Sequence, residues 1–451
     1  MHQRLISASL LFVSTLLAQA ALGGALDIEP RASLAFRYND NPTLLADESD
    51  PDSTASAVTD FSVRVSQKAE DASLEFTPLL RRIEYFKDKF DGLSTTEYYL
   101  SGEITKQAGE VVSLGGLFDF RNVSALTAED SDPNDPNQDA SATFLQIDES
   151  IERLSANPYL TWNLSQIDTL TISGQMLRVD NEKRLSPRAD YTVRSATIAY
   201  QRALRERHFV GLKTNGSRTD TVKRLEFCTF FALPTTRNSC RGLTDFQGNP
   251  GEQYIVTRTD EQDFETFSGS LTYSYQASER LDLKAQLGLA KTNISQTISE
   301  FRKLESITQA VSSDSSFTTS TYLFSATYLQ PKTDWEFELT RNVQPTSNGE
   351  PVEKTQARFI VSHRLTKLLS FELASLYYRE IQRSTTTRSK NKYLRTDLSS
   401  VWRINRELSV ATKYIHRNRD PELVSTDPIN VDNINLNRAS NEVQLRATYR
   451  F

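Results

Sequence analysis

Residues 441–451 read NEVQLRATYRF, and this stretch decides the fold because apolar and polar side chains alternate in it without a break. The apolar series consists of Val443, Leu445, Ala447, Tyr449 and Phe451. A period of two gives a β-strand one apolar face and one polar face. Taken alone, such a strand fits either the edge of a soluble β-sandwich or a wall that faces lipid, so the rest of the chain must distinguish the two.

The N-terminus is typical of a secretory signal. A single arginine precedes an apolar run over residues 5–17, and small residues around Ala20 and Ala25 offer two cleavage sites. The apolar run is too short for a membrane-spanning helix. We therefore expect residues 1–25 to be a signal peptide that is cleaved after Ala20 or Ala25, and residues 26–451 to form a single domain.

Composition fits a transmembrane barrel. After the signal no stretch of about eighteen apolar residues occurs, so we expect no transmembrane helix. Charged residues make up 24% of the chain, and the mean hydropathy is −0.49. A barrel gives such values because its strands show alternate residues to lipid and to the lumen. The 23 Phe and 17 Tyr supply rings for interfacial girdles. The net charge of −6 disfavours a nucleic-acid partner.

One unit repeats along the chain. Segments of about 8–12 residues alternate between apolar and polar side chains, most cleanly over residues 267–275 and 281–289. We count about eighteen of them, with sixteen as the nearest alternative because Pro158 and Ser195 blur two patterns. We find no linker and no shift in composition that would divide the chain into domains.

Short and long links alternate between these segments. Short links of a few residues lie on one side, and nine longer links lie on the other, among them residues 122–149, 215–262 and 292–315. An even strand number, short periplasmic turns and long outer loops are the rules for bacterial outer-membrane barrels. The sequence therefore predicts an all-β, antiparallel, up-and-down transmembrane barrel in the outer membrane of a Gram-negative bacterium.

Closure of the barrel satisfies the backbone in lipid, where each N–H and C=O needs an internal partner. It requires the first strand, near Leu34, to pair with the last, near Leu445. The terminal strand with its final Phe451 resembles the insertion signal of outer-membrane barrels. That resemblance implies recognition of the strand by the barrel-assembly machinery.

The polar series should face the lumen if the apolar series faces lipid. Both signs of charge occur on it in similar number, unlike the single-sign field of a pore for one kind of ion. Such residues either set selectivity or stabilise the wall as cross-strand pairs. The charged candidates are Arg37, Arg64, Glu75, Glu103, Asp119, Arg121, Glu336, Glu338, Arg358, Glu372, Arg395, Asp397, Arg403 and Lys413.

The outer loops are polar and acidic, and they contain both cysteines. Cys228 and Cys240 lie in the longest loop, and two cysteines in an exported protein predict one disulfide. Asp130, Asp132 and Asn134 match the first ligands of a calcium loop, but the required Gly and the final Glu are absent. We therefore expect no metal site and no cofactor.

An enzyme is a weaker interpretation. After the signal only His208, His363 and His416 remain, all on the apolar series, and no Gly-x-Ser-x-Gly motif occurs. His416 lies near Asp420 without a clearly placed serine. A TonB-dependent transporter would need a plug domain of over a hundred residues before the first strand, and strands begin here at about residue 31.

The first strand runs into Tyr38-Asn39-Asp40-Asn41. This ending resembles the β-barrel porins found with exopolysaccharide and sortase-like export clusters. The resemblance implies movement of polysaccharide across the outer membrane. Alginate-type export barrels also have eighteen strands but carry a strongly cationic lumen, which the mixed charges here do not match.

Two functional hypotheses follow from the sequence. The first is a porin-like channel that exports exopolysaccharide or passes small polar solutes. The second is a closed barrel that anchors surface polysaccharide or partner proteins through its outer loops. Under either hypothesis the partners are outer-membrane lipid, lipopolysaccharide and the assembly machinery, and polysaccharide and periplasmic export components come into consideration under the first.

Overall fold

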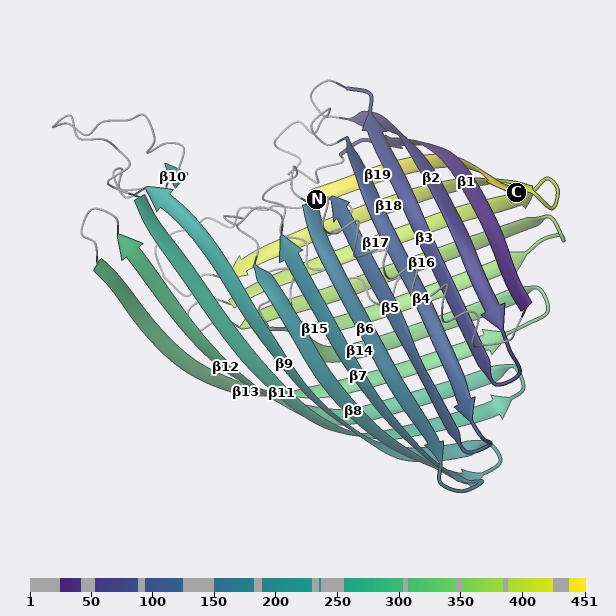
Figure 1. Ribbon diagram of the computed structural model, residues 1–451, viewed down its shortest axis with the longest axis horizontal. Coiled ribbons are helices and arrows are strands. Elements are labelled where there is room, and N and C mark those ends of the chain that lie inside the picture. Colours follow the sequence, from purple (N-terminus) through teal and green to yellow (C-terminus); the bar gives the residue numbers. More distant parts are fainter. Residues whose placement is uncertain are drawn as a thin grey trace.

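The described strands form one antiparallel sheet that closes on itself (Figure 1). The computed structural model describes residues 25–41, 53–87, 94–124, 150–181, 189–228, 235–236, 255–302, 307–345, 351–383, 388–424 and 438–451. Within these ranges no helix is long and apolar enough to cross a membrane.

The strand bounds follow the order of the chain. They are β1 (Ala25–Asn39), β2 (Thr54–Lys68), β3 (Ala72–Tyr85), β4 (Thr95–Ala108), β5 (Val112–Ser124), β6 (Ser150–Asn163), β7 (Asp168–Asn181), β8 (Asp190–Arg205), β9 (His208–Cys228), β10 (Thr235–Thr236), β11 (Ile255–Ser278), β12 (Leu281–Arg302), β13 (Ile307–Leu329), β14 (Thr333–Pro345), β15 (Pro351–Arg364), β16 (Leu369–Arg383), β17 (Arg388–Arg403), β18 (Leu408–Val424) and β19 (Arg438–Arg450).

Eighteen of these strands make the wall. Each pairs with its neighbours in the chain, and β9 pairs directly with β11. The two-residue β10 pairs only with the end of β9 and is not part of the wall. β1 pairs with β19, which closes the ring. The prediction of an eighteen-stranded antiparallel barrel is therefore confirmed, and the alternative of sixteen is wrong.

The seam between β1 and β19 is in register over nine residue pairs, from Arg31 opposite Arg450 to Asn39 opposite Glu442. At its turn end the backbone N–H of Phe451 donates to the carbonyl of Pro30. At its loop end the Asp40 carboxylate accepts hydrogen bonds from the backbone N–H and the side-chain amide of Asn441, at 2.6 and 2.7 Å. The segment that carried the family resemblance therefore fastens the two ends of the sheet together.

Short and long links alternate as predicted, but two of the long predicted loops are wrong in their bounds. β9 continues to Cys228 and β11 starts at Ile255, so strand occupies much of residues 215–262. β12 ends at Arg302 and β13 starts at Ile307, so nearly all of residues 292–315 is strand. The alternation of apolar and polar residues is lost in these segments because both faces of the strands are polar. The residues there still form paired strands, since strand pairing depends on how side chains fit their neighbours and not on the pattern alone.

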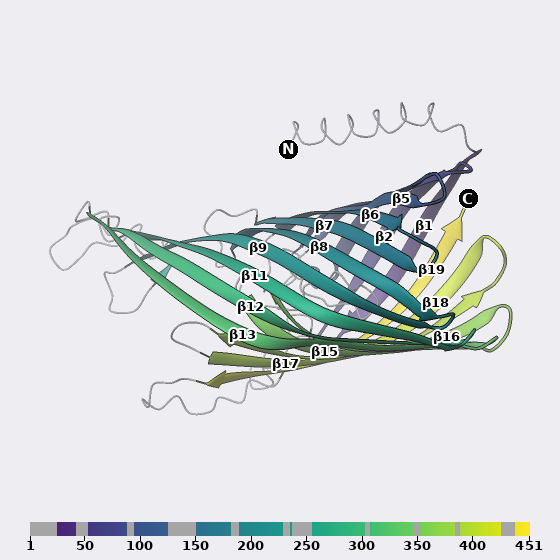
Figure 2. The same ribbon diagram turned by 90° about the horizontal axis from the view of Figure 1, so that it is seen from below.

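These four strands form an extension of the barrel on one side, which we call the wing. β9, β11, β12 and β13 have 21, 24, 22 and 23 residues, against 13 to 17 in the other wall strands. Figures 1 and 2 show them reaching past the ends of their neighbours. On the outer face of the wing Arg218 pairs with Asp220 and Asp263, at 2.7 and 3.2 Å.

The outer face of the barrel carries the apolar series. Leu271, Leu287 and Leu445 are 69%, 70% and 50% exposed. Such a band of exposed apolar side chains needs a lipid environment. Because a closed barrel also leaves no unpaired sheet edge in the hydrocarbon, the chain is a protein of the Gram-negative outer membrane.

The aromatic rings of the outer face separate towards its two ends. All three tryptophans, Trp162, Trp335 and Trp402, are exposed and lie within two residues of a strand end at a short turn. Tyr38 and Tyr98 are exposed towards the long loops. Amphipathic rings prefer the membrane–water interface, so the tryptophans place the short turns at one interface.

The inner face is less uniformly polar than the sequence predicts. Ile151, Leu177, Val179, Tyr191 and Val193 form a buried apolar cluster on β6, β7 and β8. Leu177 and Val179 belong to the series opposite the exposed Met176. Past Met176 the outer series of β7 becomes polar, with Arg178 paired to Asp180 at 2.8 Å, and the inner series becomes apolar. A pattern that keeps one face apolar along the whole strand therefore misses the cluster. A second buried cluster on β16 and β17 consists of Leu376, Tyr378 and Tyr393.

Candidate functional site

The candidate site is the charged inner wall, the face opposite the exposed apolar series. Every charged candidate from the sequence lies on a wall strand in the polar series. The structure brings twelve of the fourteen together in four groups around the ring, while Arg37 lies at the seam and Arg403 stands apart. Their role in transport stays a prediction.

The first group lies towards the short turns of β1 to β4. Arg64 contacts Glu75 at 2.7 Å and Glu29 at 3.9 Å. Glu75 stands opposite Glu103 in the register of β3 and β4. The arginine therefore offsets part of the repulsion between carboxylates on neighbouring strands, an arrangement that costs stability when it is left uncompensated.

The second group lies on β5, where Arg121 donates from Nε to Asp119 at 2.6 Å along one strand. The third group lies on β14 to β16. Arg358 pairs with Glu336 and stands opposite Glu338 in the register. The remaining member, Glu372, accepts a hydrogen bond from Ser362 at 3.2 Å.

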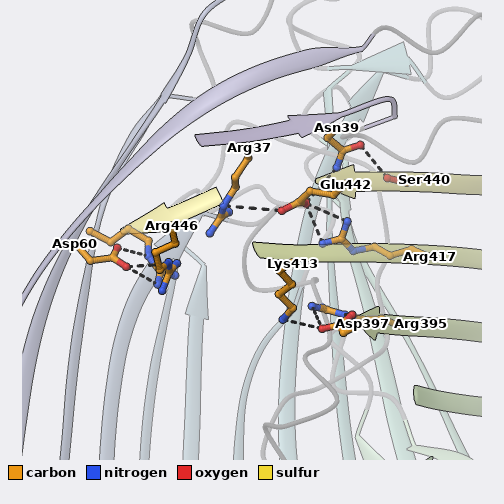
Figure 3. A network of polar contacts seen from close by, with 11 residues as sticks. Arg37, Asn39, Asp60, Arg395, Asp397, Lys413, Arg417, Ser440, Glu442 and Arg446 are labelled. Atoms are coloured by element: carbon orange, nitrogen blue, oxygen red, sulfur yellow. Dashed lines mark hydrogen bonds and ion pairs between the residues drawn. The ribbon is translucent and has the colours of Figure 1, made fainter. Parts of the chain in front are cut away.

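The fourth group is the most buried. Asp397 accepts from Arg395 Nε at 2.7 Å and from Lys413 Nζ at 2.7 Å, and the side chains of Asp397 and Arg395 are each 3% exposed (Figure 3). Contacts with two cations offset the cost of taking so deeply buried a carboxylate out of water. Arg403, the last candidate, is exposed at the turn end of β17, opposite Ser409.

At the seam the structure joins the candidate Arg37 and other inward residues to Asp60, Arg81 and Arg417, which the sequence did not single out. Glu442 accepts from both terminal nitrogens of Arg417 at 3.2 Å, while Arg37 lies 3.9 Å away. Asp60 accepts from Arg81 Nε at 2.8 Å and lies 3.6 Å from Arg446. These contacts join β18, β19, β1, β2 and β3 (Figure 3).

Only some of these ion pairs can be predicted from the sequence. Several pairs sit two residues apart on one strand, as in Arg121 with Asp119 and Arg395 with Asp397. Such a pair has both residues on the same face of a strand, so it can be found by inspection. The pairing of Asp60 with Arg81 needs the register of β2 and β3, which no local pattern gives.

The histidines contact partners other than a catalytic pair. His416 Nδ1 lies 2.9 Å from Asn441 Oδ1, whereas Asp420 accepts from Lys392 at 3.3 Å. His208 stacks on Tyr275 with ring centroids 4.6 Å apart. His363 Nδ1 lies 2.8 Å from the Thr333 hydroxyl. His416 and Asp420 are therefore held by different strands, β19 and β17.

Three predictions fall outside the described residues. These are the signal peptide over residues 1–25, of which only Ala25 is described, the absence of a metal site in the loop around Asp130, and the disulfide, because neither Cys240 nor the side chain of Cys228 is described. In the described ranges no group of three His, Cys, Asp or Glu side chains is placed to hold a metal ion.

No protein-family model and no curated protein matches this chain. Among solved structures it is similar to the open form of the ferric-catecholate import receptor Fiu from E. coli K12. The TM-score is 0.49 and the identity 10%, over 94% of this chain and 82% of that chain. For the unliganded ferric citrate transporter FecA the values are 0.47 and 11%, over 94% and 79%. For Acinetobacter baumannii OccAB2 they are 0.40 and 9%, over 94% and 98%.

Proposed function

We propose that this barrel is a channel through the outer membrane for polar solutes, with a sugar polymer as its cargo. The observation that carries the proposal is the ion-paired polar series that lines the inside of an eighteen-stranded wall. A ring of this size encloses a lumen wider than its own side chains fill, as porins of similar strand number do. Fixed charges and hydroxyl groups on the wall replace the water shell of a passing sugar.

The cargo class rests on the resemblance of residues 38–41 to the exopolysaccharide-associated porins. In that setting the chain would work with periplasmic export components, with lipopolysaccharide around its outer face and with assembly machinery reading β19. The structural role of Asp40 at the seam gives the same residues a second reason to be present, so the cargo needs its own test.

A second candidate function is a closed barrel that anchors surface polysaccharide or partner proteins. It is favoured by inner-face side chains that are completely covered, such as Tyr378 at 0% exposure and its stacked neighbour Tyr393. A covered inner wall means that other groups of the protein pack against it.

Single-channel conductance of the refolded protein in a planar bilayer tests both functions. Residues 229–254 are the correct segment to remove, because β9 and β11 continue to its borders, and an Asn-Gly turn can close the hairpin. The matched control replaces residues 125–149, which link β5 and β6. We expect steady conductance from the intact protein and interruptions when neutral or anionic oligosaccharides are added.

The other outcomes discriminate between the two functions. A silent intact protein with a conducting 229–254 variant would identify a gated channel. Silence of the intact protein and of both deletion variants would contradict the channel and favour the anchoring function. If the protein conducts and no oligosaccharide interrupts the current, the channel function is supported and the sugar polymer is rejected as its cargo.

A further inference from the structure

At the seam, donor groups on the inner wall outnumber the acceptors beside them. Arg37 Nε, Gln444 Nε2 and Arg446 Nε are buried and have no hydrogen-bond partner among the described atoms. Arg37 stands directly opposite Gln444 in the register of β1 and β19, and Arg446 is two residues further along β19. Three unmatched donors thus occupy neighbouring positions on one face.

The carboxylates nearby are already engaged. Asp60 accepts two hydrogen bonds from Arg81, at 2.8 and 3.4 Å, and one from Ser33. Glu442 accepts two from Arg417. Arg37 and Arg446 reach these acids only at 3.9 and 3.6 Å, beyond the range of a charge-assisted hydrogen bond.

Several arginines at the seam share the same carboxylates. Among the described residues Arg81 and Arg446 lie within 4 Å of Asp60, and Arg37 and Arg417 lie within 4 Å of Glu442. Four arginines therefore lie beside two carboxylates. An excess of this kind on an enclosed wall attracts anions, because the low-dielectric surroundings screen it poorly.

The two arginines remain accessible. The side chains of Arg37 and Arg446 are 26% and 30% exposed. In Figure 3 the Arg37 side chain hangs between the Asp60–Arg446 pair on one side and Glu442 on the other. Small Ala35 stands opposite Arg446 and next but one to Arg37, so no bulky side chain separates the two guanidinium groups along β1.

We propose that Arg37, Gln444 and Arg446 form a binding site for an oxyanion group, the carboxylate or phosphate of a solute or polymer, on the inner wall. A guanidinium fork matches the two oxygens of such a group, and the amide of Gln444 supplies a further donor. The proposal deepens the channel function, since it selects anionic cargo at this wall although the lumen as a whole carries both signs.

The test is isothermal titration calorimetry on the refolded full chain in detergent, with gluconate, inorganic phosphate and glucose as probes. We expect the barrel to bind gluconate or phosphate and not glucose. In R37Q/R446Q we expect affinity to fall roughly tenfold or more, because each lost charged hydrogen bond weakens binding by about that factor. R37K/R446K keeps both positive charges but removes the guanidinium forks, so its affinity should fall less than that of R37Q/R446Q.

The matched control is R406Q/R450Q, which removes two arginines at the turn end of the barrel, Arg406 between β17 and β18 and Arg450 on β19. It should bind as the unchanged chain does. Equal loss in the control, equal binding of glucose, or no binding of either anion would each overturn the site. If the double variant fails to fold, as judged by heat-modifiable mobility on a gel, the single variants R37Q and R446Q give the same comparison.

The calorimetric result is independent of conductance. Anion binding by the intact protein, together with silence of the intact protein and of both deletion variants, would retain the site and refute the channel. Conductance without anion binding would retain the channel and refute the site. The comparison of gluconate with phosphate tells whether a sugar acid or a phosphorylated group fits it better.

Discussion

Single side chains at the seam hold together strands that lie at opposite ends of the sequence. Asp40 binds both the backbone and the side chain of Asn441, and the Asn39 amide oxygen accepts from Ser440 at 2.8 Å. Asn41 donates to the carbonyl of Ala439. The whole Asn-Asp-Asn segment therefore acts on one strand, β19.

We expect Asp40→Ala to destabilise the barrel by about 1–3 kcal/mol, because it leaves a backbone N–H and an amide of Asn441 without their acceptor. Guanidinium unfolding of the protein in lipid vesicles, followed by tryptophan fluorescence, measures the change. Asp71→Ala, in a short turn at the other end of the barrel, is the control. A loss no larger than that of the control would show that closure does not depend on this clamp.

Where the backbones of neighbouring strands approach closely, packing can require a glycine. A Cβ on Gly288 of β12 would lie closer to the Gly269 carbonyl oxygen and the Ser270 Cα of β11 than real Cβ atoms come. On β11 itself a Cβ on Gly269 would meet nothing within 4 Å. The two glycines are neighbours in the sheet, yet only one of them is required by packing.

Gly288→Ala should therefore cost about 1–3 kcal/mol of unfolding free energy, since backbone atoms have to shift to make room. Gly269→Ala should be neutral or slightly stabilising, because it reduces the freedom of the unfolded chain. The same vesicle unfolding assay compares the pair. Similar values for both variants would mean that the strands separate at little cost.

Sequence patterns located all eighteen wall strands because lipid on one side enforces alternation at every strand. The patterns failed in the parts of the wall where lipid no longer enforces alternation. The polar Ser and Thr run of β13 at residues 312–321 gave no period, although the backbone remains paired. The inner apolar cluster with Tyr191 and the surplus of donors around Gln444 depend on register between strands, and register is a property of the folded sheet.

The whole molecule has two different membrane interfaces. Its three tryptophans all lie near short turns, whereas exposed tyrosines lie at both ends, Tyr38 and Tyr98 towards the long loops and Tyr449 at the short turns. We expect a quencher placed at the lipid headgroups to quench tryptophan fluorescence more strongly than one at the bilayer centre. Parallax measurement with the refolded barrel checks this, and Trp335→Phe serves as a control that lowers intensity without changing depth. Equal quenching at both depths would contradict the assigned membrane position.

The wing makes the barrel asymmetric about the membrane normal. Because β9 and β11–β13 continue past their neighbours, the rim is tall on one flank and low on the opposite one, where the seam lies. A large solute that approaches from the wing meets the wall that β9 and β11–β13 form, whereas the described strands beside the seam end lower. Two such barrels side by side therefore differ according to which flanks face each other, and a neighbour that contacts only the wing would fix the rotation of the barrel about the membrane normal.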